Sequence, residues 1–204
     1  MNDIAALPRI GGHLALDFAN TAGLHASAVR REHVNRYHDV LDWAAAAGVL
    51  APRLNRTLAT SAERRPRDAA SALAKVVALR ENIYRVFARL AQRKPPLRED
   101  LVRLHQARIA TLAAAEPEWA EHRVALRWPD DPADLLRPIY PVLLATGELL
   151  ESGDFDRLRQ CGNHPCGWLF LDLSKNGSRR WCSSAECGNA TRVRRFRART
   201  AGSV

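Results

Sequence analysis

The sequence predicts a mainly α-helical protein of the α+β class, with a helical N-terminal domain followed by a small cysteine-containing module. Three observations lead to this expectation. Apolar residues recur at helical spacing through most of the chain between residues 36 and 150. Two short stretches alternate apolar with polar residues instead, and they predict a small antiparallel β ribbon. All four cysteines lie between residues 161 and 187.

The first expected element is a strand within residues 10–22, where apolar side chains occupy every second position. Three polar residues, Asp17, Asn20 and Thr21, gather at its exit. The ordinary interpretation of such residues is local turn and cap chemistry. The alternative is that they form the floor of a polar pocket, which would bind a small effector molecule.

The helices that follow are expected from their apolar periodicity and their stop signals. Paired prolines at residues 95 and 96 end the longest helix, and Pro138 and Pro141 predict a kinked or broken start to the last. The predicted ranges are residues 36–47, 52–60, 67–93, 97–115 and 134–150. On the helix over 97–115 the buried face is expected to consist of Leu101, Leu104, Ile109 and Leu112.

A second alternating stretch, residues 121–128, predicts a strand that pairs with residues 13–19 to complete the ribbon. The polar run at 151–154 resembles a hinge. We therefore divide the chain into an N-terminal domain over 1–152 and a C-terminal module over 157–204.

The cysteines follow the spacing C-x4-C-x15-C-x4-C, at Cys161, Cys166, Cys182 and Cys187. Two close pairs separated by enough residues for a hairpin are typical of a closed tetrahedral Zn²⁺ site. Strands are expected at 158–160 and 168–171, with a turn at Asn176 and Gly177 between the pairs. The sequence therefore predicts a treble-clef-like module with one structural zinc.

Two disulfides are the alternative, and they would need an oxidising compartment. The N-terminal stretch has no basic segment followed by a long apolar run and a cleavage site, so we expect a cytoplasmic protein. A reducing cytoplasm favours metal over disulfides. No apolar run approaches eighteen residues, so no membrane helix is expected.

The C-terminal stretch resembles the CGNR zinc-finger family. The resemblance lies in the first cysteine knuckle, the WLFLD run at 168–172, the SRRWC run at 178–182 and CGNA at 187–190. The family's final arginine is Ala190 here, so the role of that arginine is in doubt for this chain. The runs GGHLALDFANT and RYHDVLDWAAAAGVL are similar to the ABATE domain that precedes this finger. The resemblance implies a stress-induced transcriptional regulator.

Positive charge is concentrated in the C-terminal module. Residues 157–204 hold ten Lys and Arg against two acids, which accounts for +8 of the chain's net +9. A basic patch on a zinc module indicates a nucleic-acid partner, and we expect DNA. A capping box at Ser183 and Glu186 predicts the last helix, with Ala190, Val193 and Phe196 facing the zinc module. The arginines expected to contact nucleic acid are Arg179, Arg180, Arg192, Arg194, Arg195, Arg197 and Arg199.

The expected function is zinc-dependent transcriptional regulation, in which the N-terminal domain senses a ligand or forms a homodimer. We expect no catalysis, because the sequence has no glycine-rich phosphate loop, no G-x-S-x-G and no H-E-x-x-H. Two alternatives stay open. The finger could bind RNA or protein, or a pocket near Asp17, Asn20 and Thr21 could hold an enzyme site.

Overall fold

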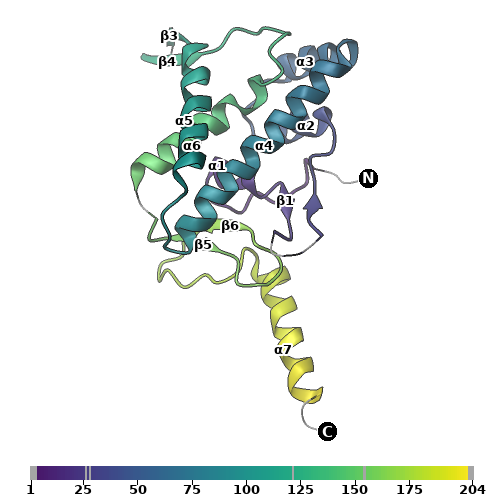
Figure 1. Ribbon diagram of the computed structural model, residues 1–204, viewed down its shortest axis with the longest axis vertical. Helices are drawn as coiled ribbons and strands as arrows, with labels where there is room; N and C mark the ends of the chain where they lie inside the picture. Colours follow the sequence, from purple (N-terminus) through teal and green to yellow (C-terminus); the bar gives the residue numbers. More distant parts are fainter. Residues whose placement is uncertain (1–3, 26, 28, 121, 154, 202–204) are drawn as a thin grey trace.

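The computed structural model describes residues 4–25, 27, 29–120, 122–153 and 155–201. The predicted mainly α class is confirmed, since 54% of the structure is helical and the strands form small antiparallel pairs. Figure 1 shows a helical body from which α7 projects at one end. The helices are α1 (Leu14–Ala19), α2 (Tyr37–Ala46), α3 (Pro52–Arg64), α4 (Pro66–Ala91), α5 (Arg98–Ala113), α6 (Tyr140–Ser152) and α7 (Asn189–Ala201).

The strands form three antiparallel pairs among the described residues. The pairs are β1 (Ala22–Gly23) with β2 (Arg31–Glu32), β3 (Glu116–Ala120) with β4 (Arg123–Arg127), and β5 (Leu158–Gln160) with β6 (Leu169–Leu171). Within the described residues no helix is both long enough and apolar enough to cross a membrane.

The predicted strand over residues 10–22 is wrong for its central part, which forms α1. His13 caps this helix, and its Nδ1 accepts a hydrogen bond from the Ala15 amide. The alternating pattern was misleading because the alanines of this segment are buried together with its larger apolar residues. The buried positions in α1 are 15, 16, 18 and 19, which is a helical spacing.

The long helix α4 runs through the centre of the body and packs against α1, α2, α3 and α5. Its fully buried residues include Val76, Ile83 and Phe87. The guanidinium of Arg80 is also buried, and it forms an ion pair with Glu32 of β2 at 2.6 Å. This pair anchors the β1–β2 loop region to α4.

The last helix of the body has the broken start that its two prolines predicted. A 3₁₀ turn, Arg137–Ile139, comes directly before α6. The helix ends at Ser152, where Gly153 adopts a positive φ of 66°. Asp154, the last residue of the predicted hinge, lies outside the described residues.

The strand predicted over 121–128 exists as β4, but its predicted partner is wrong. It pairs with β3, immediately before it in the chain, because residues 14–19 of the expected partner are helical. Glu121, the first residue of that prediction, lies outside the described residues. The side chain of Trp128 then donates a hydrogen bond to the Thr111 carbonyl and holds the hairpin at the end of α5.

The predicted buried face of α5 is also wrong for three of its four residues. Only Leu104 is buried, whereas Leu101, Ile109 and Leu112 are 37%, 51% and 37% exposed. The helix rests on α4 and α6 along a different stripe, which includes Asp100 and Thr111. An apolar surface therefore remains uncovered on the outside of α5.

After Gly153 the chain returns to the body. The β5–β6 pair packs against α1 and α4, and Leu158 and Leu169 belong to the same apolar core as the helices. The predicted turn at Asn176 and Gly177 is present, with a φ of 60° at the glycine. The strand pair thus connects the cysteine-rich segment directly to the helical body.

Candidate metal centre and basic helix

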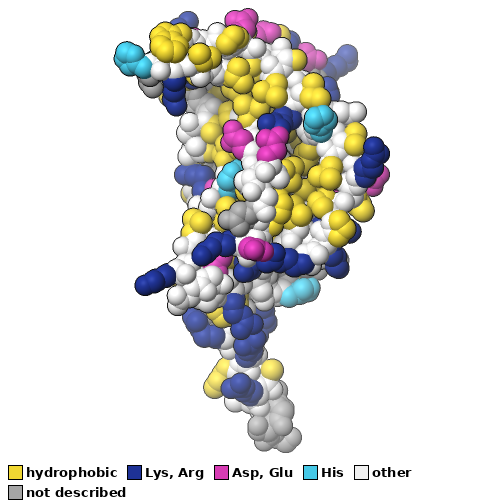
Figure 2. All heavy atoms as spheres, turned by 90° about the vertical axis from the view of Figure 1, so that its left-hand side faces the viewer, with side chains coloured by type: hydrophobic (Ala, Val, Ile, Leu, Met, Phe, Trp, Pro, Cys, Tyr) yellow, Lys and Arg dark blue, Asp and Glu magenta, His cyan; other side chains and the backbone are white. Residues whose placement is uncertain are grey.

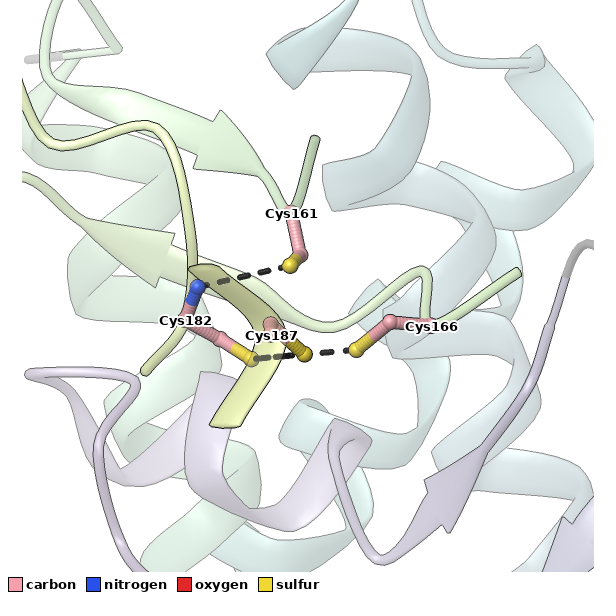
Figure 3. Close-up of side chains that lie close together, drawn as sticks. All are labelled: Cys161, Cys166, Cys182 and Cys187. Carbon is pink, nitrogen blue, oxygen red and sulfur yellow. Dashed lines mark hydrogen bonds between the residues drawn. The ribbon is translucent and has the colours of Figure 1, made fainter. Parts of the chain in front are cut away.

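The four cysteines are positioned by the short strand pair and by the start of α7. Cys161 directly follows β5, and its amide donates to the Trp168 carbonyl at 2.8 Å. Cys166 lies in the loop before β6. Cys182 lies just before the π-helical turn Ser184–Gly188 that opens α7, and Cys187 lies within that turn. Figure 3 shows that all four side chains point toward one centre.

The sulfur atoms have the spacing that a tetrahedral zinc site needs. All four lie within 4.8 Å of one another. The Sγ atoms of Cys166 and Cys182 are 3.7 Å apart, and those of Cys182 and Cys187 are 3.5 Å apart. Ligands at about 2.3 Å from a tetrahedral zinc are separated by about 3.8 Å. A disulfide would need about 2.05 Å.

The surroundings of these sulfurs also suit a metal. The Cys182 amide donates to Cys161 Sγ at 3.4 Å, which supports a thiolate. The neighbouring Cys161 raises the pKa of Cys166 to about 12, and the same neighbour and Cys166 raise the pKa of Cys182. Zinc must therefore displace thiol protons when it binds. Four thiolates leave no open position, so this site holds one structural zinc ion.

A buried polar network holds the loop that carries the second cysteine pair. Asp172 is fully buried and accepts hydrogen bonds from Ser174 Oγ and from the Arg179 amide, which lower its pKa. The guanidinium of Arg179 donates to the carbonyls of Ile10 and Cys182, and it lies 4.2 Å over the ring of Phe170. Arg179 therefore has a structural role in this loop.

The basic helix α7 is attached to the metal centre at its first turns. Ser183 caps it as predicted, accepting from the Glu186 amide at 3.2 Å. Thr191 Oγ1 donates to the Cys187 carbonyl at 2.8 Å, and the guanidinium of Arg194 donates to Asn163 Oδ1 in the first knuckle. Beyond these contacts the helix leaves the body (Figure 1).

The predicted apolar contact between α7 and the zinc module is wrong. Val193 is 39% exposed, Phe196 is 67% exposed, and Ala190 is also exposed. The reason is that the helix axis points away from the module. The remaining predicted arginines of the helix are exposed: Arg192, Arg194, Arg195, Arg197 and Arg199. Arg180 is exposed as well, beside the ring of Trp181. Residues 202–204 of the predicted module lie outside the described residues.

The three polar residues predicted at the exit of the first strand are occupied by intramolecular hydrogen bonds. Asp17 accepts from the Gly11 amide at 2.8 Å, and Thr21 Oγ1 donates to the Phe18 carbonyl at 2.8 Å. Asn20 forms two bonds with Leu169 of β6, one to its carbonyl and one from its amide, each at 2.8 Å. These contacts fit the interpretation as turn and cap chemistry, with Asn20 also joining α1 to the cysteine-rich segment.

Two further hydrogen bonds join the helical body to the cysteine-rich segment. The sequence analysis did not anticipate them. The indole of Trp168 donates to the Ala22 carbonyl at 2.9 Å, and the hydroxyl of Tyr84 on α4 donates to the Gly167 carbonyl at 3.0 Å. Their partners lie 146 and 83 residues away in the chain. Neither residue type signals a pairing over such distances.

A four-cysteine zinc centre that carries a basic helix and rests on a helical body defines a zinc-finger protein. The family model "CGNR zinc finger" matches residues 157–200. The ABATE model, described as "Putative stress-induced transcription regulator", matches residues 12–153. Because this match covers well over half of the chain, the protein belongs to the ABATE family. No curated protein matches the chain. The family indicates a regulatory rather than a catalytic protein.

Proposed function

We propose that this zinc-containing regulator binds DNA in the cytoplasm and that α7 is the element that contacts it. The observation that carries the proposal is the projecting, arginine-rich helix fixed to a zinc centre. Figure 2 shows Lys and Arg side chains gathered around the base of this projection. Positive charge in such a position attracts a phosphate backbone.

The dimensions of α7 suit the major groove of B-DNA. Its 13 residues form a rod about 20 Å long, and the groove is about 12 Å wide and admits one α-helix. Arg192, Arg195 and Arg199 follow one another at three- and four-residue steps and share a face. The exposed side chain of Phe196 lies beside this face, four residues after Arg192, and would meet the apolar methyl groups of thymine.

The predicted arginines do not have equal roles in this proposal. Arg179 and Arg194 already hold the finger together through protein contacts. We therefore assign them mainly to positioning of α7. The phosphate and base contacts fall to the other exposed arginines, which are Arg180, Arg192, Arg195, Arg197 and Arg199.

Ligand sensing is the second part of the proposal. An effector that used Asp17, Asn20 or Thr21 would have to replace their internal hydrogen bonds. A cavity of about 280 Å³ between the β1–β2 region and the metal centre offers a more accessible site. Arg31 and Glu186 both line it, together with three of the zinc-binding cysteines, so its charge selects neither an anion nor a cation. An effector bound there would contact both the helical body and the finger.

A mobility-shift assay with a randomised duplex DNA pool, repeated at several salt concentrations, tests the DNA proposal. Each phosphate contact should contribute about −0.9 to the log–log dependence of affinity on salt. Removal of residues 189–204 should abolish binding while the zinc stays bound. A selected RNA pool that binds more tightly than any DNA would redirect the proposal to RNA, and binding that ignores salt would overturn it.

A further inference from the structure

The largest apolar side chains left in water are concentrated on α5 and on the adjacent β3–β4 hairpin. Figure 2 looks onto this side of the body, and hydrophobic side chains gather over its upper half. Within this group the exposed fractions are largest at Trp119 with 70%, Val124 with 67% and Ile109 with 51%. The other large members are Leu101, Val102, Leu112 and Leu126.

The hairpin presents an apolar face and a polar face. Trp119 is paired with Val124, and Pro117 is paired with Leu126. Alternate residues of a strand share a face, so these four side chains lie on one side of the hairpin. All four residues are exposed. The opposite side carries charged residues, including the ion pair of Glu118 with Arg127 at 3.1 Å.

The outer surface of α5 has the spacing of a helix-pairing seam. Val102, His105, Ile109 and Leu112 follow steps of three, four and three residues. This is the a/d pattern by which two helices pack knobs into holes. None of these side chains is buried within the chain. The inner stripe of the same helix already packs on α4 and α6, so the seam is a second contact surface, and its His105 also borders the groove between α5 and α6.

We propose that this surface binds a second copy of the chain, with the two α5 helices packed antiparallel across a twofold axis. The area argues for such a partner. The seven large side chains leave roughly 600 Å² of apolar surface in water, whereas a stable interface buries about 800 Å² per partner including its polar rim. An uncovered apolar area of roughly 600 Å² lies at the upper end of what a soluble monomer exposes.

The helix dipoles favour the antiparallel arrangement. In an antiparallel pair the partially positive start of each α5 lies beside the partially negative end of the other. Side-chain charges do not decide the direction, because Glu99 and Asp100 balance the arginines of the first turns and Glu118 of the hairpin is paired with Arg127. A parallel partner would place two ends of like partial charge side by side. In the antiparallel register Val102 of one copy faces Leu112 of the other.

This inference gives a surface to the homodimer that the sequence analysis expected, and it does not depend on DNA binding. Sedimentation velocity of the zinc-loaded full chain, without nucleic acid, should give twice the chain mass of 22.7 kDa at about 10 µM. Ile109→Glu should shift the species to a monomer, with an unchanged circular dichroism spectrum. Val29→Glu is the control, because Val29 is 75% exposed and lies outside the patch.

The register has its own test. Val102→Glu and Leu112→Lys should each weaken the dimer at least tenfold, and the double variant should restore it, because each glutamate then faces a lysine of the other copy. A wild-type chain that stays monomeric at about 100 µM would overturn the inference. So would a dimer that Ile109→Glu leaves intact. A double variant that stays as weak as the single variants would exclude the antiparallel register.

Discussion

Replacement of Asn20 by alanine should destabilise the whole fold, because its side chain substitutes for a neighbouring strand. The bond between Cys161 and Trp168 places Gln160 and Leu169 at a non-hydrogen-bonded position of the β5–β6 ladder. The amide and carbonyl of Leu169 therefore point away from β5, toward α1. Asn20 satisfies both at 2.8 Å, and it is only 1% exposed.

The magnitude follows from the groups left behind. Asn20→Ala removes two hydrogen bonds worth about 0.5–1.5 kcal/mol each. It also leaves one buried amide and one buried carbonyl without a partner. With partial access of water to the space vacated, we expect a loss of about 2–4 kcal/mol from the free energy of unfolding. That is a large part of the stability of a domain of this size.

Urea unfolding of the zinc-loaded protein, followed by tryptophan fluorescence, measures this loss. Asn176→Ala is the matched control, because Asn176 is exposed in the turn between the cysteine pairs. The control should change the free energy of unfolding by less than about 0.5 kcal/mol. A loss below about 1 kcal/mol for Asn20→Ala would refute the view that this amide joins the two segments.

Three further outcomes are expected. Purified protein should contain one zinc per chain, and Cys187→Ser should release it; elemental analysis showing full zinc in the Cys182→Ser/Cys187→Ser variant would contradict the site. Hydrogen bonds from Arg85 lower the pKa of the buried Asp100. The pair therefore stabilises the fold fully above the ordinary carboxyl pKa, and this effect is lost only as the pH falls from there through the lowered pKa of Asp100. Asp100→Asn should cost about 1–3 kcal/mol near neutral pH and progressively less as the pH falls through that acidic range, as pH-dependent thermal melts can show. Ala190→Arg should strengthen DNA binding, because position 190 is exposed at the start of α7; unchanged affinity would exclude a contact there.

The sequence predicted the metal centre well because its ligands are defined by local spacing. The helices α2 to α5 were also predicted, with ends within a few residues, since caps and prolines mark them. The element α1 was mistaken for a strand because its small alanines look neutral in a pattern but are fully buried. Proline is untypical of a strand interior, so Pro117 argued against a strand at β3. The prediction therefore gave β4 the wrong partner.

Long-range relations account for most of the remaining differences. An apolar stripe on α5 predicts a packing partner for the helix, but it does not indicate whether that partner belongs to the same chain or to another. The pairing of Asn20 with Leu169 joins positions 149 residues apart, and nothing in either local sequence indicates it. The direction of α7 likewise depends on the orientation of the first knuckle, where Arg194 meets Asn163.

The position of β6 inside the common core has a consequence for protein engineering. Leu158 and Leu169 have 1% and 0% of their surface exposed, and their neighbours come from the helical body. A finger cut out before residue 157 would carry these side chains into water and would lose the partners of Trp168 and Leu169. The finger is therefore not an independent folding unit that can be moved by itself. A chimera that moves the finger to another protein would have to transplant α1 and the facing part of α4 with it.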